Sequence, residues 1–182
     1  MKPRSLAVPL VALALAGCLS TEDELFPLVG GDDVTTRPGD YACRSVDAHG
    51  AAKSERGRLI RLRRDKQTQY VFAAPDDTSA EPAALHRVAD GVYLVAVAHA
   101  EGPGEDLYLA AIAATGASFR LYAPAEGAVA AAPALAAKSG VTLVHNPFGD
   151  DLSGPVEAQR AFALTFAGDL NNWRLAADCR RR

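Results

Sequence analysis

The chain has 182 residues, of which 49% are hydrophobic and 23% charged, and its formal net charge is -3. This length suits one ordinary domain and is too short for two sizeable hydrophobic cores. The composition is that of a folded globular protein, and the slight acidity argues against nucleic-acid binding, which favours a basic surface. One tract, at the N-terminus, departs from this composition.

The first seventeen residues have the layout of a secretory signal. Lys2 and Arg4 precede a short apolar run over residues 6–16, and this order is typical of segments that are removed on export. The run is shorter than the about 20 residues that a membrane-spanning helix needs. We therefore expect residues 1–17 to be removed, which also takes away two basic residues.

Small residues and a cysteine end this tract, as Leu15-Ala16-Gly17-Cys18. The four positions resemble the lipobox of bacterial lipoproteins. The resemblance implies cleavage before Cys18 and a lipid on its thiol that anchors the protein to the membrane. Leu19 stands where an Asp would retain the protein in the inner membrane, so the resemblance implies outer-membrane attachment facing the periplasm. The alternative is an ordinary signal peptide with an incidental cysteine.

Residues 18–38 are expected to form the acylated N-terminus and a tether to one β-rich domain over residues 39–182. Polar, acidic and Gly/Pro-rich pieces flank an apolar patch, as is typical of a linker. Fully extended, this segment would reach about 70 Å. Its apolar residues 26–29 fit either a strap packed on the domain or a docking segment for a membrane partner.

With Cys18 acylated, Cys43 and Cys179 remain as an even pair. An even count in an oxidising periplasm favours a structural disulfide, which would join the two ends of the domain. Neither residue belongs to a Cys-x-x-Cys motif, so a redox role is not expected. For a loop this long, the chain-entropy model gives the bond roughly 4 to 5 kcal/mol.

The alternation of apolar and polar residues predicts a mainly β (α+β) fold, an antiparallel meander or a partly closed barrel. Strands are expected near residues 41–45, 59–64, 69–73, 84–88, 92–98, 107–113, 118–122 and 141–145. Asp90-Gly91 predicts a tight hairpin turn, and in the resulting register His86 faces Val95. Residues 92–98 are apolar on both faces, so we expect a central strand covered on both sides.

Helical signals appear in the last third of the chain. Pro133 and Gly140 fit the start and the end of a short Ala-rich helix. Residues 146–151 are expected to form a loop, and residues 155–166 fit either a strand or a helix. An aspartate caps a predicted C-terminal helix over residues 169–177, whose apolar residues share one face.

The sequence contains no catalytic or metal-binding motif that we can identify. Gly-x-Ser-x-Gly, His-Glu-x-x-His and a phosphate loop are absent. The histidines never occur at the spacing of metal ligands; they are His49, His86, His99 and His145. We therefore expect no enzyme, metal or cofactor, and interpret the histidines as polar groups of strands and loops.

A basic cluster stands out in this otherwise acidic chain. Its arginines are Arg56, Arg58, Arg61, Arg63 and Arg64. A charged edge strand discourages edge-to-edge aggregation. The alternative is an anion-binding face for lipopolysaccharide phosphate, peptidoglycan carboxylate or an acidic envelope protein.

Two short segments, Tyr41-Ala-Cys43 and Thr-Gly-Ala-Ser-Phe over residues 115–119, resemble the cysteine strand and the inhibitory loop of the membrane-bound inhibitors of c-type lysozyme. That family's Trp-x-Lys-Gly motif is absent, and Trp173 is the only tryptophan. Bacterial lipocalins are lipoproteins of similar size, but Gly39-Asp-Tyr41 stands in place of their Gly-x-Trp.

We therefore expect a membrane-anchored, non-enzymatic envelope protein with an interaction or structural role. The alternatives are an enzyme inhibitor, an apolar-ligand carrier or a hydrolase without a recognisable motif. A closed cavity would favour a carrier, a protruding loop an inhibitor, and convergent polar groups in a cleft an enzyme.

Overall fold

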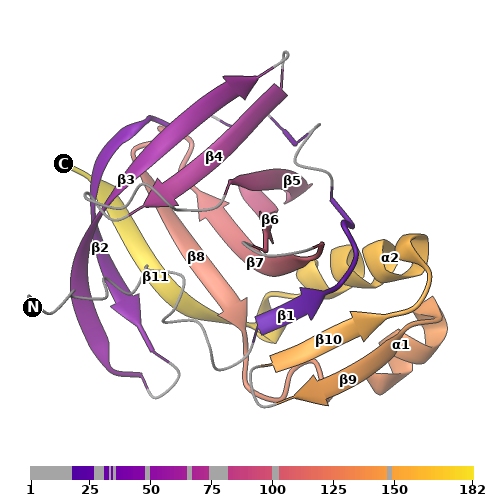
Figure 1. The fold of residues 1–182 in the computed structure, drawn as a ribbon. Helices are drawn as coiled ribbons and strands as arrows, with labels where there is room; N and C mark the ends of the chain where they lie inside the picture. Colours follow the sequence, from indigo (N-terminus) through magenta and orange to yellow (C-terminus); the bar gives the residue numbers. More distant parts are fainter. Residues whose placement is uncertain are drawn as a thin grey trace, which may run out of the picture.

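The fold is mainly β and is built on one large, strongly bent sheet (Figure 1). The computed structural model describes residues 18–26, 31–32, 34, 36–47, 50–64, 67–73, 82–99, 103–146 and 149–182. The first strands are β1 (Cys18–Thr21), β2 (Gly39–Val46), β3 (Ala52–Arg64), β4 (Gln67–Ala73), β5 (Ala83–Ala89) and β6 (Val92–Ala98). The later elements are β7 (Glu105–Ile112), β8 (Ser118–Pro124), α1 (Pro133–Ser139), β9 (Thr142–Asn146), β10 (Gly149–Ser153), α2 (Val156–Ala167), the 3-10 helix η2 (Leu170–Asn172) and β11 (Trp173–Arg181).

Antiparallel strands follow one another around a ring, in the order β6, β5, β4, β3, β2, β11, β8 and β7. A pairing between β6 and β7 joins the two ends of this series. In the described part of the chain, β4 and β5 meet only at Tyr70 and Ala83. The sheet is therefore ring-like without being a barrel, and the predicted mainly β fold with its antiparallel meander is confirmed.

β7 is the point at which the sheet branches. Leu109–Ile112 pair with β8, whereas Leu107 and Glu105 pair with β1. β1 continues in parallel to β10, which pairs with β9. Cys18–Thr21 thus lie inside the sheet, where the sequence predicted the start of a tether. Leu19, which is fully buried, belongs to the hydrophobic core.

The predicted cysteine pair joins β2 and β11, which are neighbours in the ring and its first and last strands in chain order. Cys43 on β2 lies directly opposite Cys179 on β11, and their sulfur atoms are 2.06 Å apart, a bonding distance. The central position of residues 92–98 is also confirmed, because Leu94 and Ala96 pack in a core outside the ring while Val95 packs inside it.

Helix α1 agrees with its sequence signals, since it begins at Pro133 and Gly140 follows it in a left-handed conformation (φ 77°). The undecided residues 155–166 lie mostly in α2. Its buried residues recur at helical spacing: Gln159, Phe162, Ala163, Phe166 and Ala167. Leu164, which a strand would place on the same face as Phe162 and Phe166, is instead 37% exposed. α1 and α2 lie on one side of the sheet, near β9, β10 and β1 (Figure 1).

The predicted C-terminal helix is wrong. Asp169 does cap a turn, but only the short η2, and β11 follows it. The four-residue spacing between Trp173 and Ala177 fits a strand as well as a helix. A bulge between Leu175 and Ala177 then places Trp173 in the outer core and Ala177 inside the ring.

Two further predictions of local structure are corrected. Residues 149–151 of the expected loop over residues 146–151 instead begin strand β10, which pairs with β9 and with the distant β1. A bulge between Arg87 and Ala89 on β5 shifts the pairing of β5 with β6 by one residue. His86 therefore faces Leu94 rather than the predicted Val95.

Candidate functional site

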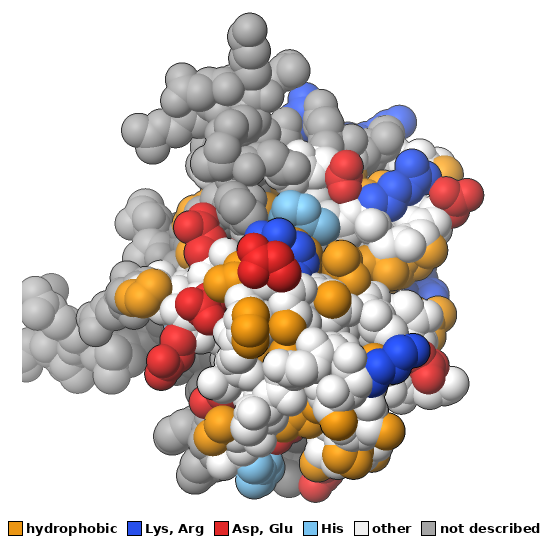
Figure 2. Space-filling model, turned by 90° about the vertical axis from the view of Figure 1, so that its right-hand side faces the viewer, with side chains coloured by type: hydrophobic (Ala, Val, Ile, Leu, Met, Phe, Trp, Pro, Cys, Tyr) orange, Lys and Arg blue, Asp and Glu red, His pale blue; other side chains and the backbone are white. Residues whose placement is uncertain are grey.

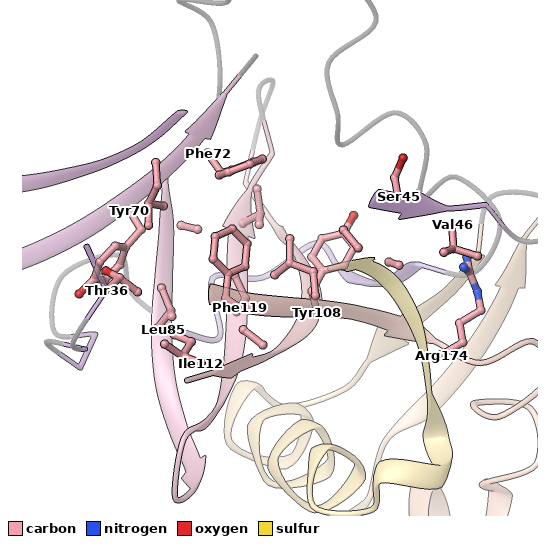
Figure 3. A pocket seen from close by; sticks show the side chains of 18 residues that line it. Thr36, Ser45, Val46, Tyr70, Phe72, Leu85, Tyr108, Ile112, Phe119 and Arg174 are labelled. Atoms are coloured by element: carbon pink, nitrogen blue, oxygen red, sulfur yellow. The ribbon is translucent and has the colours of Figure 1, made fainter. Parts of the chain in front are cut away.

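The main candidate site is an apolar cavity of about 160 Å³ inside the ring. Each ring strand contributes to its wall, for example through Val46, Leu59, Tyr70, Leu85, Val95, Tyr108, Phe119 and Ala177. The labelled side chains in Figure 3 project from opposite strands toward this common space. The cavity remains unfilled because small side chains, those of Ala83, Ala110 and Ala176, also line its wall.

The segment before β2 covers one end of the ring. The backbone N–H of Asp32 donates to the Leu85 carbonyl (2.7 Å), and that of Val34 donates to the Tyr70 hydroxyl (2.9 Å). Farther along, the Arg37 N–H donates to the Gly116 carbonyl (3.1 Å), in the turn between β7 and β8. The segment is thus bound to three parts of the rim, and Thr36 on it contributes to the cavity wall.

The other end of the ring carries the more polar part of the wall. Ser45 and Val46 end β2, and Arg174 begins β11 beside them. In Figure 3 these three residues lie on the side away from Thr36 and Tyr70. Val46 and Arg174 are only half-buried, so the wall is partly exposed at this end.

One polar atom in the cavity wall stands out. Thr36 is 8% exposed, and its hydroxyl oxygen finds no hydrogen-bond partner among the described residues. By contrast, the Tyr70 hydroxyl accepts from the Val34 N–H and donates to the Val34 carbonyl. A buried hydroxyl without a partner is uncommon and calls for an explanation such as a bound water or ligand.

A second group of polar contacts holds the N-terminal segment, residues 18–26, against the outside of the ring. The Thr21 hydroxyl donates to the side-chain carbonyl of Gln159 (2.6 Å), and the Arg160 Nε–H donates to the Leu25 carbonyl (2.8 Å). The Phe26 N–H donates to both carboxylate oxygens of Glu105 at 3.1 and 3.2 Å. These contacts come from α2 and β7, which fix the segment from two sides.

Glu105 is the most perturbed acidic group in this region. It is 1% exposed, and burial raises its pKa to about 7, while the Phe26 N–H partly opposes that shift. Beside it, the ring of His86 lies 4.8 Å from that of Phe26, and burial lowers the pKa of His86. The sequence analysis missed this buried carboxyl, because nothing local distinguishes Glu105 from a solvated strand residue.

Ser20, Asp106 and His99 form a small polar cluster beside β1. The Ser20 hydroxyl donates to Asp106 Oδ1 (2.7 Å), and His99 Nε2 lies 3.4 Å from the same oxygen. A catalytic serine needs a base on its hydroxyl, with the carboxylate behind that base. Here the carboxylate stands between the two, so this cluster does not have the geometry of a Ser-His-Asp triad.

The remaining histidines form no common site in the described part of the chain. His145 Nδ1 lies 2.9 Å from Asp150 across β9 and β10, and His49 lies outside the described residues. Among the residues that the structure describes, no group of three His, Cys, Asp or Glu side chains could hold a metal ion.

The basic cluster on β3 is divided between two faces of the strand. Arg56 and Arg58 alternate with buried Gly57 and Leu59, whereas Arg61 shares the face of Leu59. Arg58 Nε donates to Asp40 at 2.8 Å. Arg63 and Arg64 belong to β3, but their side chains lie outside the described part. The described arginines therefore do not form one continuous face.

The turn over residues 115–118 is held against the domain. The Gly116 carbonyl accepts from the Tyr41 hydroxyl (3.2 Å) and from the Arg37 N–H (3.1 Å). Gly116 has a positive φ of 66°, which a tight turn requires. This is the segment similar to the inhibitory loop of lysozyme inhibitors, and its central backbone is engaged in internal contacts.

On the side shown in Figure 2, hydrophobic side chains lie among polar and charged ones. The large exposed hydrophobic residues of the described part belong to five different elements; they are Ile60, Val144, Leu164, Leu170 and Leu175. A polar hollow outside the ring is lined by Ser20, Asp23 and His99, so two residues of the cluster described above belong to its wall.

The comparisons with known proteins leave the geometry as the main evidence. No family model, no curated protein and no solved structure matches this chain. None of the helices within the described ranges combines the length and the apolar character that crossing a bilayer requires. The predicted signal segment, residues 1–17, and residues 27–29 of the apolar patch lie outside the described residues.

Proposed function

We propose that this protein binds a small apolar ligand inside its ring of strands, without catalysing a reaction. The observation that carries the proposal is the cavity of about 160 Å³ with its apolar wall. An eight-stranded ring encloses a space that side chains just fill or that holds one small ligand. An apolar cavity of about 150 Å³ in another protein stays dry and binds benzene, so this cavity has the size for one aromatic ring or a short alkyl segment.

Two features of the wall support ligand binding over simple packing. The segment from Asp32 to Arg37 covers one end, while the end near Val46 and Arg174 is only half-buried. A ligand that enters near Val46 and Arg174 would meet Thr36 and Tyr70 at the far side of the cavity. The mostly apolar wall makes burial of an apolar ligand favourable.

Binding of benzene to the purified protein tests this proposal, with the rise of the unfolding temperature as the measurement. Ligand present at about 100 times its Kd stabilises the native state by about 2.7 kcal/mol. Ala110→Leu fills the cavity from β7 and should abolish the rise. Ala111→Leu is the matched control, because Ala111 is the next residue of β7 and does not line the cavity.

Wild type and Ala111→Leu should both respond to benzene, and Ala110→Leu should not. No response of the wild type, or an equal response of all three proteins, contradicts binding inside the ring. Circular dichroism of the three proteins verifies that each is folded.

We further propose that lipid on Cys18 anchors this protein to a membrane, facing the periplasm. The support is the lipobox-like sequence that ends at Cys18. β1 begins at this residue, so an acylated Cys18 would hold the sheet itself at the bilayer surface. Radioactive palmitate should label the wild type in bacterial cells and not Cys18→Ala. Absence of label on the wild type, or label retained by the variant, contradicts the anchor.

A further inference from the structure

We infer that the cavity selects ligands that carry one uncharged hydrogen-bonding group, and that the Thr36 hydroxyl binds this group. The inference rests on the proposed function and goes beyond it, because it names the chemical class of the ligand and a residue that determines specificity. The ligand class is that of a small phenol or alcohol, as opposed to a hydrocarbon or a carboxylate.

The starting point is the exceptional status of the Thr36 hydroxyl. Three side chains in the described part hold buried polar atoms without a hydrogen-bond partner: those of Thr36, Glu55 and His86. Of these, only Thr36 lines the cavity. Thr36 is only 8% exposed, so bulk water does not replace the missing hydrogen-bond partner.

The surroundings of Thr36 hold it in place. On either side of it, the Val34 N–H is bound to the Tyr70 hydroxyl and the Arg37 N–H to the Gly116 carbonyl. The Thr36 N–H itself donates to the Val34 carbonyl (2.8 Å). These contacts hold the backbone of Thr36 beside the cavity, and its burial strengthens any hydrogen bond that its hydroxyl makes there.

The remaining wall argues for an uncharged group. Around Thr36 the cavity is lined by aromatic and aliphatic residues such as Tyr70 and Leu85. The cationic wall residue, Arg174, lies at the other end. A carboxylate carried to Thr36 would be desolvated without a counter-charge, which costs far more than one hydroxyl hydrogen bond returns. A hydroxyl can both donate to and accept from Thr36.

The affinities of phenol and benzene for the full-length protein and for Thr36→Val test the inference. Valine has nearly the shape of threonine and lacks the hydroxyl. The measured quantity is the ratio of the Kd of phenol to that of benzene, obtained by calorimetry or ligand-observed nuclear magnetic resonance. One neutral hydrogen bond corresponds to roughly 3- to 10-fold in affinity, so the ratio should rise by that factor in Thr36→Val.

Thr36→Ser keeps the hydroxyl and should retain the ratio of the wild type. Thr36→Ala serves as a second variant without the hydroxyl, in case the valine variant does not fold, and should show the same rise. An unchanged ratio in both hydroxyl-free variants, with benzene still bound, overturns the role of Thr36 and leaves cavity binding intact. Failure of the wild type to bind either compound overturns both the inference and the proposed function.

Discussion

Strands β6 and β7 separate two cores that differ in how completely they are filled. On the outer face, Phe162 and Phe166 of α2 stack at 5.7 Å, and Phe166 meets Trp173 edge-on at 5.4 Å. Together with Leu94 and Leu107 these rings form a continuous core. On the inner face, side chains from all eight ring strands meet, and a cavity of about 160 Å³ remains.

The difference shows what a helix adds to a sheet. A helix can move as a unit until its apolar stripe meets the sheet, and α2 does so with side chains at helical spacing. The inside of a ring has no such freedom, because the number and tilt of the strands set its width. Where Ala110 and Ala177 face inward, nothing compensates for their small size. The outer core is thus closely packed, whereas the inner one retains a cavity.

The largest expected loss of stability comes from removing the disulfide, whose two cysteines belong to the inner core. Cys43 and Cys179 are separated by 136 residues, and the chain-entropy model gives a loop of this length about 5 kcal/mol. Replacing both by Ser should lower the free energy of unfolding in urea by up to that amount. The control variant is Ser45→Ala, two residues after Cys43 on β2, which removes the hydrogen bond from the Ser45 hydroxyl to the Lys53 carbonyl (3.2 Å) and should cost about 1 kcal/mol. Two free thiols in the non-reduced wild type, detected by mass spectrometry, would contradict the bond.

Truncation of the outer core comes next. Phe162→Ala removes a fully buried ring from α2, and such substitutions cost about 3 to 5 kcal/mol. Leu164→Ala is the matched control on the same helix, because Leu164 is 37% exposed, and should cost about 1 kcal/mol or less. Urea unfolding measures both. Equal losses for the two variants would show that α2 does not fill the core as described.

Glu105 places a titratable group in this otherwise apolar outer core. Its pKa is about 7 in the folded protein against an ordinary value of 4.5, so the folded state holds the proton more tightly than the unfolded one. Stability contributed by this group is therefore fully present below pH 4.5 and is lost as the pH rises to about 7. The loss is on the order of 3 kcal/mol.

Glu105→Gln should remove this pH dependence, because the amide stays neutral and its oxygen can still accept from the Phe26 N–H. The free energy of unfolding, measured for both proteins from pH 4 to pH 8, gives the comparison. The free energy of unfolding of the variant should increase relative to that of the wild type as the pH rises from 4.5 to about 7. A difference between the two that is the same at every pH would contradict a buried, titrating Glu105.

Sequence could predict the elements whose signals are local. The Asp90-Gly91 turn, the Pro133 start of α1 and the alternating Tyr41 and Cys43 of β2 all rest on neighbouring residues. The pairing of Cys43 with Cys179 could be predicted because these two cysteines remain once Cys18 is assigned to the lipid. What sequence could not show is pairing between distant segments, which placed Cys18–Thr21 between β7 and β10.

The candidate site was beyond sequence analysis for a related reason. The cavity results from small residues on several strands that face one space, and no local pattern separates Ala110 from any other strand alanine. Likewise, Thr36 is an ordinary polar residue of a loop until the fold buries its hydroxyl. The misplaced C-terminal helix has the same origin, because the i to i+4 spacing of Trp173 and Ala177 fits both structures until β8 and β2 select the strand.

Two Ala→Leu variants, one in each core, compare the cores directly and are expected to change the free energy of unfolding least. Ala163→Leu inserts three carbon atoms between α2 and the sheet, where Ala163 is 1% exposed, and overpacking costs about 1 to 3 kcal/mol. Ala110→Leu adds the same atoms on the cavity wall, where the space exists, and should change the free energy of unfolding by less than about 1 kcal/mol. Urea unfolding without ligand measures both variants. A larger loss for Ala110→Leu than for Ala163→Leu would mean that the ring interior is as tightly packed as the outer core, and that no room for a ligand exists there.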